Sequence, residues 1–435
     1  MAEVKKCYQN ISVTAMDLNN GMFKIDNKFI FRDLSDFECD YTIFSNDRFY
    51  TGSKITLDCK PGESQIVHID IPDPYKAEHI TGVNPNQEYF INFSFKIKEG
   101  NDLLPAGTEL AYEQIQLNIT KKAPTALPTS PELNVKNDNI AILLSNNDFS
   151  FRIEKKEGFP TSLIYKGEEL LEGTMRPNFW RAPTLNDDVD WNAKRLWQAA
   201  GLDNLTVSKK SFDVKRIDAG NVNVTVNLEF VNNKGELVLK TRQLYKVNGF
   251  GDIVVTMKVM PTDKVVTFPK VGTQLMMPSE YNKVRYFGKD TENYPDRNSS
   301  GRVGVYNRNA MDFFEMHEEP QESGNRTEVR WFAITNQAGN GLFVSGEQKL
   351  NFSVYKYSDI ELTKAERINQ IVPAGFWTVN IDYKQAPLGT ATCGPGALDK
   401  YLIKKDVYEY TFRMRPFTKS DTTPDKLYMQ EVFKK

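Results

Sequence analysis

The stretch Val222-Asn-Val-Thr-Val-Asn-Leu-Glu-Phe230 alternates apolar and polar residues without a break. Successive side chains of a β-strand point to opposite faces, so this period of two buries one face of a strand and leaves the other in water. The same alternation runs through 67–71 and 89–97, and Asn248-Gly249, a tight-turn signal, separates two further runs of this kind. Strands at short spacing with Gly, Asn and Pro between them indicate antiparallel sheets, so we predict an all-β protein.

One segment departs from the strand pattern. Residues 190–200 begin with Asp190, a suitable N-cap, and are followed by Gly201, a suitable C-terminal stop. We expect a short helix here that packs against a sheet through Trp197 and Ala200.

A proline-rich segment marks the clearest domain boundary. Three prolines occur within 121–131, and because proline lacks a backbone donor and resists both helix and sheet, this segment is predicted to be a semi-rigid linker. It divides an immunoglobulin-like β-sandwich domain at 1–120 from a much larger domain at 132–435. We expect the larger part to be one large sandwich, although its length also suits two domains.

Charge and hydropathy exclude several classes of partner. The 435 residues carry 55 Lys and Arg against 57 Asp and Glu, a net charge of -2, which offers no electrostatic attraction to nucleic acid or to an acidic membrane. No run approaches the roughly 20 apolar residues of a membrane helix, and the segment 1–6 lacks the apolar core of a signal peptide. We therefore expect a soluble protein, and the cytoplasm and the periplasm suit it equally.

Metal-ligand motifs are missing from the sequence. The cysteines and histidines are scattered along the chain as Cys7, Cys39, Cys59, Cys393, His68, His79 and His317. They form neither a C-x-x-C pair nor an H-E-x-x-H motif. We expect reduced, unpaired thiols and no metal or other cofactor in this chain.

The acidic residues do not form an obvious catalytic pair. A glycosidase needs two carboxylates roughly 5 to 9.5 Å apart across the scissile bond. The candidates are Asp187 with Asp188, and Glu318 and Glu319 with Glu322. Neighbours in an extended segment point to opposite faces, so we interpret these residues as solvated or salt-bridged loop acids. No nucleophile elbow, P-loop or dinucleotide-binding glycine pattern occurs either, so the sequence by itself predicts no active site.

Several stretches combine aromatic residues with Arg, Asn and Asp. They are Phe179–Asp188, Thr291–Arg297, Glu319–Arg326, Val379–Tyr383 and Gly389–Pro395. On loops at one end of a sandwich, such groups can bind a sugar, because a ring stacks on C–H faces while amides and carboxylates hold hydroxyls. A buried Arg–Asp network that only pins long loops would have the same composition. The residue types leave both interpretations open.

An ordered set of motifs resembles one known family, the family 2 β-galactosidases. The matching stretches are Glu3–Asn10, Asn178–Asp187, Trp197–Leu202, Glu292–Arg297, Pro320–Arg326, Asn380–Gln385 and Cys393–Pro395. The first resembles the segment that leaves the catalytic barrel of these enzymes and enters an immunoglobulin-like domain. The others resemble signatures of their small-chain domain, in the family's order. The resemblance extends over almost the whole chain and implies that it is the C-terminal region of such an enzyme. The start at Met1 suits an expressed fragment or a separately encoded small subunit, and of these two we expect the fragment.

The resemblance implies a fold and a division of labour. The larger domain is expected to be an antiparallel supersandwich of the galactose-mutarotase type. The nucleophile, the acid/base glutamate and the magnesium and sodium sites are expected in or next to a (β/α)8 barrel on the N-terminal side, a pattern that this chain does not contain. The chain is then a non-catalytic part of an enzyme that hydrolyses terminal β-D-galactosides, inactive alone. Its implied partners are that barrel, the sugars through the full-length enzyme and, in an oligomer, further copies of the chain.

The resemblance also implies where this region meets the sugar. In the family the last domain completes one wall of the active site, and some members place a tryptophan of a late loop against the acceptor sugar. Cys393 stands at that position here, flanked by Thr392 and Gly394, and these three are the predicted substrate-binding residues. A thiol offers far less apolar area than an indole, so strong stacking is not expected.

Two other classes of function remain as alternatives. A stand-alone carbohydrate-binding module would need an exposed aromatic platform on one sheet. An aldose mutarotase uses histidine and glutamate for proton transfer, and His317 is the only histidine in 132–435, which argues against a two-histidine site.

Overall fold

The computed structural model describes residues 1–435 apart from 47, 72–87, 118–128, 190–191, 431 and 433–435. The chain divides into two compact units, one of Met1–Thr125 with Ser299–Val305 and one of Ala126–Asn298 with Tyr306–Lys435. Most of the predicted linker at 121–131 lies outside the described residues, so the domain boundaries at 120 and 132 stay predictions.

The first unit is a sandwich of antiparallel sheets. It begins with helix α1 (Ala2–Cys7), and one sheet has the order β1 (Ile11–Asp17), β2 (Met22–Asn27), β5 (Ser64–His68). The facing sheet has the order β4 (Arg48–Ile55), β3 (Phe37–Ser45), β6 (Tyr89–Ile97), β7 (Glu109–Leu117), with η1 (Leu34–Asp36) before β3. Phe23 of β2 and Phe93 of β6 are fully buried, and their ring centroids lie 5.1 Å apart. The two sheets therefore pack face to face.

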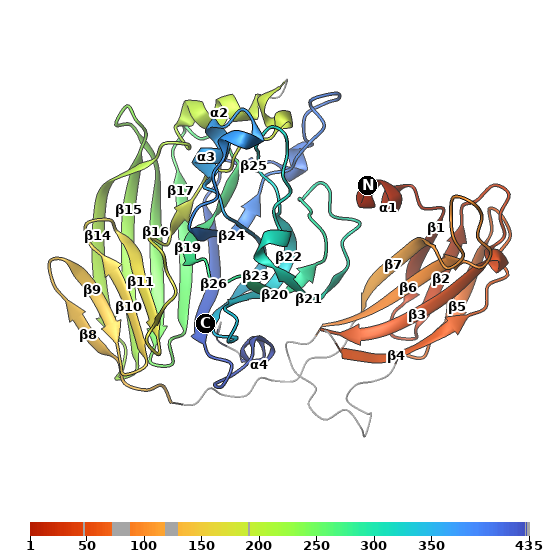
Figure 1. Cartoon of the computed structure of the whole chain (residues 1–435), viewed down its shortest axis with the longest axis horizontal. Helices are drawn as coiled ribbons and strands as arrows, with labels where there is room; N and C mark the ends of the chain where they lie inside the picture. Colours follow the sequence, from red (N-terminus) through yellow and green to blue (C-terminus); the bar gives the residue numbers. More distant parts are fainter. Residues whose placement is uncertain (47, 72–87, 118–128, 190–191, 431, 433–435) are drawn as a thin grey trace. The chain divides into compact units, whose positions relative to one another are not determined.

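The second unit packs a small sheet on a large one (Figure 1). The small sheet has the order β12 (Glu168–Glu169), β11 (Phe159–Tyr165), β10 (Phe149–Glu154), β9 (Ala141–Ser145), β8 (Asn134–Asn137). The main path of the large sheet is β13 (Arg176–Asn178), β19 (Lys270–Pro278), β24 (Phe376–Gln385), β23 (Gly341–Tyr355), β26 (Tyr408–Phe417), β17 (Ile253–Pro261), β16 (Leu237–Asn248), β15 (Asn221–Val231), β14 (Thr206–Arg216).

Shorter elements complete this unit, although the first three residues of β21 belong to the Ser299–Val305 segment of the first unit. β22 (Arg326–Thr335) pairs with β23, β20 (Lys283–Lys289) with β22, β21 (Val303–Asn309) with β20, and β18 (Thr267–Phe268) with β25 (Ile403–Lys404). The helical elements are η2 (Leu185–Asp188), α2 (Ala193–Ala200), η3 (Ala310–Asp312), α3 (Asp359–Lys364), η4 (Ile368–Gln370), η5 (Asp399–Tyr401) and α4 (Pro424–Tyr428). In the described part of the chain, no helix is long and apolar enough to cross a membrane.

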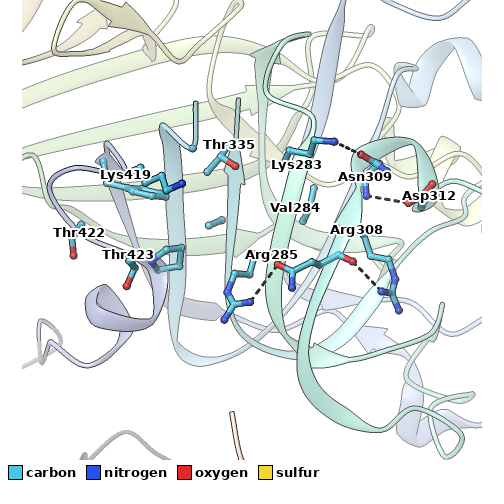
Figure 2. Close-up of a pocket in the computed structure, with 15 residues that line it drawn as sticks. Lys283, Val284, Arg285, Arg308, Asn309, Asp312, Thr335, Lys419, Thr422 and Thr423 are labelled. Carbon is cyan, nitrogen blue, oxygen red and sulfur yellow. Dashed lines mark hydrogen bonds between the residues drawn. The ribbon is translucent and has the colours of Figure 1, made fainter. Parts of the chain in front are cut away.

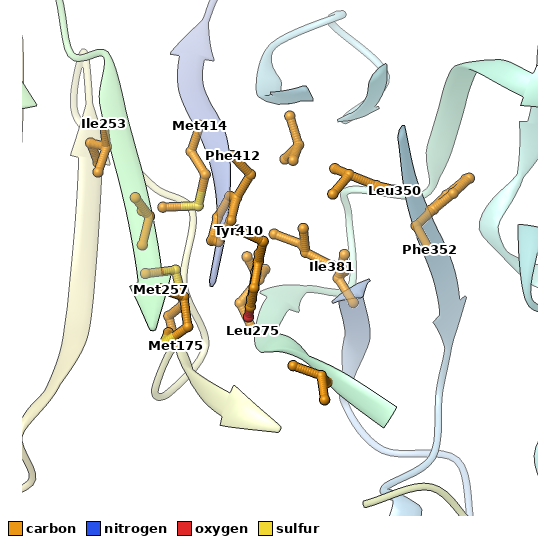
Figure 3. Packing of buried hydrophobic residues seen from close by; sticks show 14 of the residues in the cluster. Met175, Ile253, Met257, Leu275, Leu350, Phe352, Ile381, Tyr410, Phe412 and Met414 are labelled. Carbon is orange, nitrogen blue, oxygen red and sulfur yellow. The ribbon is translucent and has the colours of Figure 1, made fainter. Parts of the chain in front are cut away.

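The all-β prediction is confirmed, and the alternation at 222–230 is the clearest case. These residues form most of β15, in which each apolar residue from Val222 to Phe230 is buried while its polar neighbours are at least partly exposed. The buried faces of the two sheets share one core, in which Phe151 of β10 lies 5.8 Å from Tyr245 of β16 between ring centroids. Figure 3 shows part of this core around Met257, Phe412 and Ile381.

The predicted helix is present, with one difference at its start. α2 runs from Ala193 to Ala200, its N-cap is Asn192, and Asp190 lies outside the described residues. Trp197 and Ala200 are buried as expected, and the Trp197 indole N–H donates to Thr267 Oγ1 of β18 at 3.1 Å. Gly201 ends the helix in the left-handed region at φ 81°, which glycine adopts without a steric penalty.

Candidate functional site

A buried arginine links the first of the loops that stand out in the sequence to the residues just before the last one. Arg181 follows β13, and its Nη2 donates to both carboxylate oxygens of Asp187 at 2.8 and 2.9 Å. The same guanidinium donates to the backbone carbonyls of Ala386 at 2.7 Å and Pro387 at 2.9 Å, just after β24. Both charged side chains are 0% exposed. This pair holds two loops that lie about 200 residues apart in the chain.

Burial acts on the pKa of both partners of the Arg181–Asp187 pair. Burial lowers the pKa of Arg181, but the interactions with Asp187, Glu322 and Tyr294 together outweigh it and leave this pKa raised. Burial also raises the pKa of Asp187, against the effect of the Arg181 guanidinium and of the hydrogen bonds from Thr184. Asp187 also accepts from the Thr184 N–H at 2.8 Å and from the Thr184 hydroxyl at 3.1 Å. Both charges thus receive several hydrogen bonds, which a buried ion pair needs to offset its desolvation, while the buried Arg181 Nε has no hydrogen-bond partner among the described residues.

A second set of contacts fixes the backbone of 388–392. Asp296 accepts from the N–H groups of Leu388 at 3.0 Å and Gly389 at 2.8 Å. Arg297 donates to the Gly389 carbonyl, which also accepts from Asn186 Nδ2 at 3.0 Å. Gly389 has a φ of 69°, a left-handed conformation that favours glycine. Side chains from both the 179–188 and the 291–297 stretches thus hold this loop in place.

The predicted substrate-binding residues lie on the surface of this loop. Thr392 is exposed, and Asn186 Oδ1 accepts from its N–H at 3.0 Å and from its hydroxyl at 2.8 Å. Cys393 is exposed with a free thiol, and its N–H donates to the Thr390 carbonyl at 3.1 Å. Gly394 is half-buried, and a Cβ there would lie 3.2 Å from Thr390 Oγ1. The loop therefore has a fixed backbone and presents Cys393 to solvent.

A cluster of buried charges lies where the described strands β19 and β24 meet the 319–326 stretch. Lys270 Nζ is 3.4 Å from Asp382 Oδ2 and 3.9 Å from Glu322 Oε2, and all three side chains are at most 1% exposed. Gln385 Nε2 donates to Glu322 Oε1 at 2.9 Å. A Cβ on Gly272 would lie 1.9 Å from Asp382 Oδ1, so the glycine leaves the space that this carboxylate occupies.

Burial changes the proton affinity of these two acids. It raises the pKa of Glu322 to about 7 and the pKa of Asp382 to about 6, although the Lys270 ammonium acts in the opposite direction on both. The Asp382 and Glu322 carboxylates in turn raise the pKa of Lys270 against the effect of burial. A carboxylate with such a pKa is typical of acid/base sites, but the same values arise in structural ion-pair networks.

The environment of the two acids favours a structural role. Both share one lysine beneath the loops, and neither side chain reaches solvent. Asp188, next to buried Asp187, is instead exposed and pairs with Lys194 at 2.6 Å. In the described part of the chain, no group of three or more His, Cys, Asp or Glu side chains is placed to hold a metal ion. The arrangement pins loops, as the second interpretation of these stretches expects.

The comparisons with known proteins agree with the predicted family. The family described as "Beta galactosidase small chain" matches residues 145–414, and "Beta-galactosidase, domain 4" matches residues 23–118. A β-galactosidase of Priestia megaterium is 27% identical over 392 residues, which cover 89% of this chain and 37% of the relative. A β-galactosidase of Actinobacillus pleuropneumoniae is 24% identical over 400 residues, covering 91% and 38% respectively.

The match to these two relatives covers only part of their length. The chain spans less than two-fifths of the length of these two relatives. Among solved structures, galactose 1-epimerase from Lactobacillus acidophilus matches 66% of this chain and 99% of its own, with a TM-score of 0.38 and 10% identity. Because the small-chain match covers more than half of the sequence, the chain belongs to the β-galactosidase small-chain family.

Proposed function

We propose that the chain is the non-catalytic C-terminal part of an enzyme that hydrolyses terminal β-D-galactosides, and that its Gly389–Pro395 loop is one wall of the sugar site. The observation that carries the proposal is the way this loop is held. Asn186, Asp296 and Arg297 fix its backbone, while Cys393 remains exposed. A preorganised backbone under an exposed side chain is what a binding wall requires, since little conformational entropy is lost when the ligand arrives.

The chain matches less than two-fifths of the length of its relatives, so we propose that the catalytic residues belong to the part of the enzyme that this chain does not cover. The catalytic barrel, with its acid/base pair and its magnesium and sodium sites, would lie in the part of the enzyme outside this chain, and the barrel would be its partner. The buried charges of this chain would then support the wall: Arg181 holds the carbonyls of Ala386 and Pro387, and Gln385 is bound to Glu322.

Among the three predicted contact residues, Cys393 is proposed to face the acceptor sugar. The Thr392 hydroxyl donates to Asn186, so its role would be to shape the loop. Gly394 would be needed because a larger residue there would crowd Thr390. The Cys393 side chain, in contrast, is a free thiol on the surface.

Replacing Cys393 with Trp in the full-length enzyme tests this assignment. An aromatic contact contributes roughly 0.5–1.5 kcal/mol beyond its buried area, and 1.4 kcal/mol corresponds to about a tenfold change in affinity. We therefore expect C393W to raise galactosyl transfer to added glucose, relative to hydrolysis, by about three- to tenfold. The first step on a nitrophenyl galactoside should change little, because its leaving group needs no such wall.

A matched control places the same indole elsewhere. Cys7 is also an exposed free cysteine, and C7W should leave the partition between transfer and hydrolysis unchanged. If a folded C393W enzyme shows the same ratio of transfer to hydrolysis as C7W, the loop does not border the sugar site.

A further inference from the structure

A separate cavity of the second unit is lined mainly by cationic and hydrogen-bond-donating side chains. Its volume is about 590 Å³, within the range of small-molecule sites. We name it the cationic pocket, and its lining residues with charged or polar side chains are Lys283, Arg285, Asn307, Arg308, Asn309, Asp312, Thr335, Lys419, Thr422 and Thr423. These residues come from β20, β21, η3, β22 and the segment that follows β26, and most of them are labelled in Figure 2.

Positive charge dominates this lining. Lys283, Arg285, Arg308 and Lys419 contribute four cations, whereas Asp312 is the only acid among the lining residues. Arg285 is partly neutralised, because its Nη2 lies 3.2 Å from Asp425 Oδ2. Even when Asp425 is included, cations exceed acids by two. The pocket therefore attracts anions.

Two asparagines hold the cations of β20 in position. Lys283 Nζ donates to Asn309 Oδ1 at 2.9 Å, and Arg285 Nη1 donates to Asn307 Oδ1 at 3.3 Å. The side-chain oxygens of both asparagines thus accept from cations. Their side-chain NH2 groups are the part of each amide that can donate to a ligand. Asp312 Oδ2 already accepts from the Asn309 backbone N–H at 3.0 Å.

The balance of donors and acceptors selects the kind of ligand. A neutral sugar needs acceptors as well as donors, since each of its hydroxyls is both. This pocket offers ammonium, guanidinium, amide and hydroxyl donors and few acceptors, which matches an oxyanion. The volume exceeds what an inorganic ion fills, and Phe417, Val284 and Pro424 supply apolar surface for the rest of a ligand.

We propose that the cationic pocket binds the phosphate group of a small phosphate ester, such as a sugar phosphate. Lys283 and Lys419 approach the phosphate as point charges, and Arg308 and the threonine hydroxyls donate to its oxygens. This site is independent of the Gly389–Pro395 loop, so neither proposal depends on the other.

Isothermal titration of the 435-residue chain tests the site, with inorganic phosphate, glucose 6-phosphate and glucose as probes. We expect glucose 6-phosphate to bind more tightly than phosphate, and glucose not to bind. The double variant K283Q/K419Q should weaken glucose 6-phosphate binding at least about tenfold, because charge-assisted hydrogen bonds are about twice as strong as neutral ones. Raising the ionic strength to about 1 M should weaken it further, since the Debye length falls to about 3 Å.

The control is K215Q/K246Q, which removes the same charge from exposed positions of β14 and β16. It should leave binding within about twofold of the parent chain. The proposal fails if glucose 6-phosphate does not bind at about 10 mM, if both double variants weaken binding equally, or if glucose binds as tightly as its phosphate ester.

Discussion

Two neighbouring aspartates of η2 differ in burial and therefore in what their charge contributes. Asp187 pairs with Arg181 where both are 0% exposed, whereas Asp188 pairs with Lys194 at the surface. Replacing Asp187 with Asn leaves a buried arginine without its counter-charge, which typically costs about 3–5 kcal/mol. D188N should change the free energy of unfolding by less than about 1 kcal/mol. Urea unfolding of the two variants at pH 7 measures the contrast, and equal effects would contradict this account of the pair.

The buried Glu322 predicts a specific dependence of stability on pH. Its pKa is about 7 in the folded chain against 4.5 for an ordinary glutamate. The folded state therefore holds this proton more tightly than the unfolded state. The stabilisation is complete below pH 4.5 and is lost as the pH rises through 7. Because one pKa unit corresponds to about 1.4 kcal/mol, the loss amounts to roughly 3–4 kcal/mol at most.

The variant E322Q isolates this effect, because glutamine cannot release the proton. Relative to the parent chain, E322Q should gain stability between pH 5 and pH 8, as measured by urea unfolding at each pH. E319Q, at an exposed neighbour, should run parallel to the parent. A constant offset between E322Q and the parent over this range would show that Glu322 is already ionised at pH 5.

Some contacts of the site could be predicted from the sequence, and others could not. Arg181 and Asp187 are six positions apart in one loop. Because they are close in sequence, the composition of this loop is enough to suggest that they pair. Lys270, Glu322 and Asp382 come from separate stretches: pairing of β19 with β24 brings Lys270 and Asp382 together, and Glu322 comes from a loop whose N–H donates to the Ala182 carbonyl at 3.1 Å. Lys270 begins a strand that carries no other charged residue, and a lysine in a buried strand needs a buried partner. The identity of that partner depends on tertiary structure.

At the scale of the element, the C-terminus of α2 depends on its glycine. Gly201 has a φ of 81°, and a Cβ there would lie 2.4 Å from Asn232 Cβ. G201A therefore combines an unfavourable backbone conformation with a steric clash, and we expect a loss of more than about 2 kcal/mol. Gly235 has a φ of 74°, but a Cβ added there would meet no atom within 4 Å, so G235A should cost only about 1 kcal/mol. Thermal unfolding compares the two, and equal losses would exclude the clash.

The strands themselves were easier to predict than the strands with which each of them pairs. Alternation identifies the buried face of β15, because the side-chain period of a strand is two. It does not identify the partner: β24 pairs with β19 and β23, and Asn380 faces Gln274 over more than 100 intervening residues. Such pairing is decided by which faces fit together in the whole unit, so the sheet order had to come from the structure.

For the whole molecule, the predicted linker gives a measurable expectation. If 121–131 joins two independently folded parts, limited proteolysis should cut there first, because proline-rich segments between domains are accessible. The product should be a stable fragment that begins near Pro131. Mass spectrometry of the first products identifies the site, and a first cut within 200–330 would mean that the larger part is not a single folded unit.

The central proposal is that this chain supports and borders the sugar site of a β-galactosidase and does not itself catalyse. Four acids of the described chain have a raised pKa: Asp187, Glu292, Glu322 and Asp382. Glu322 and Asp382 are buried and share Lys270, Asp187 is buried against Arg181, and half-buried Glu292 accepts from the Gly324 N–H. The direct measurement is the turnover of a nitrophenyl β-galactoside by the purified 435-residue chain, free of host enzyme. We expect no release of nitrophenol above the rate measured in buffer without protein. Release that rises in proportion to the chain and disappears in E322Q would contradict it.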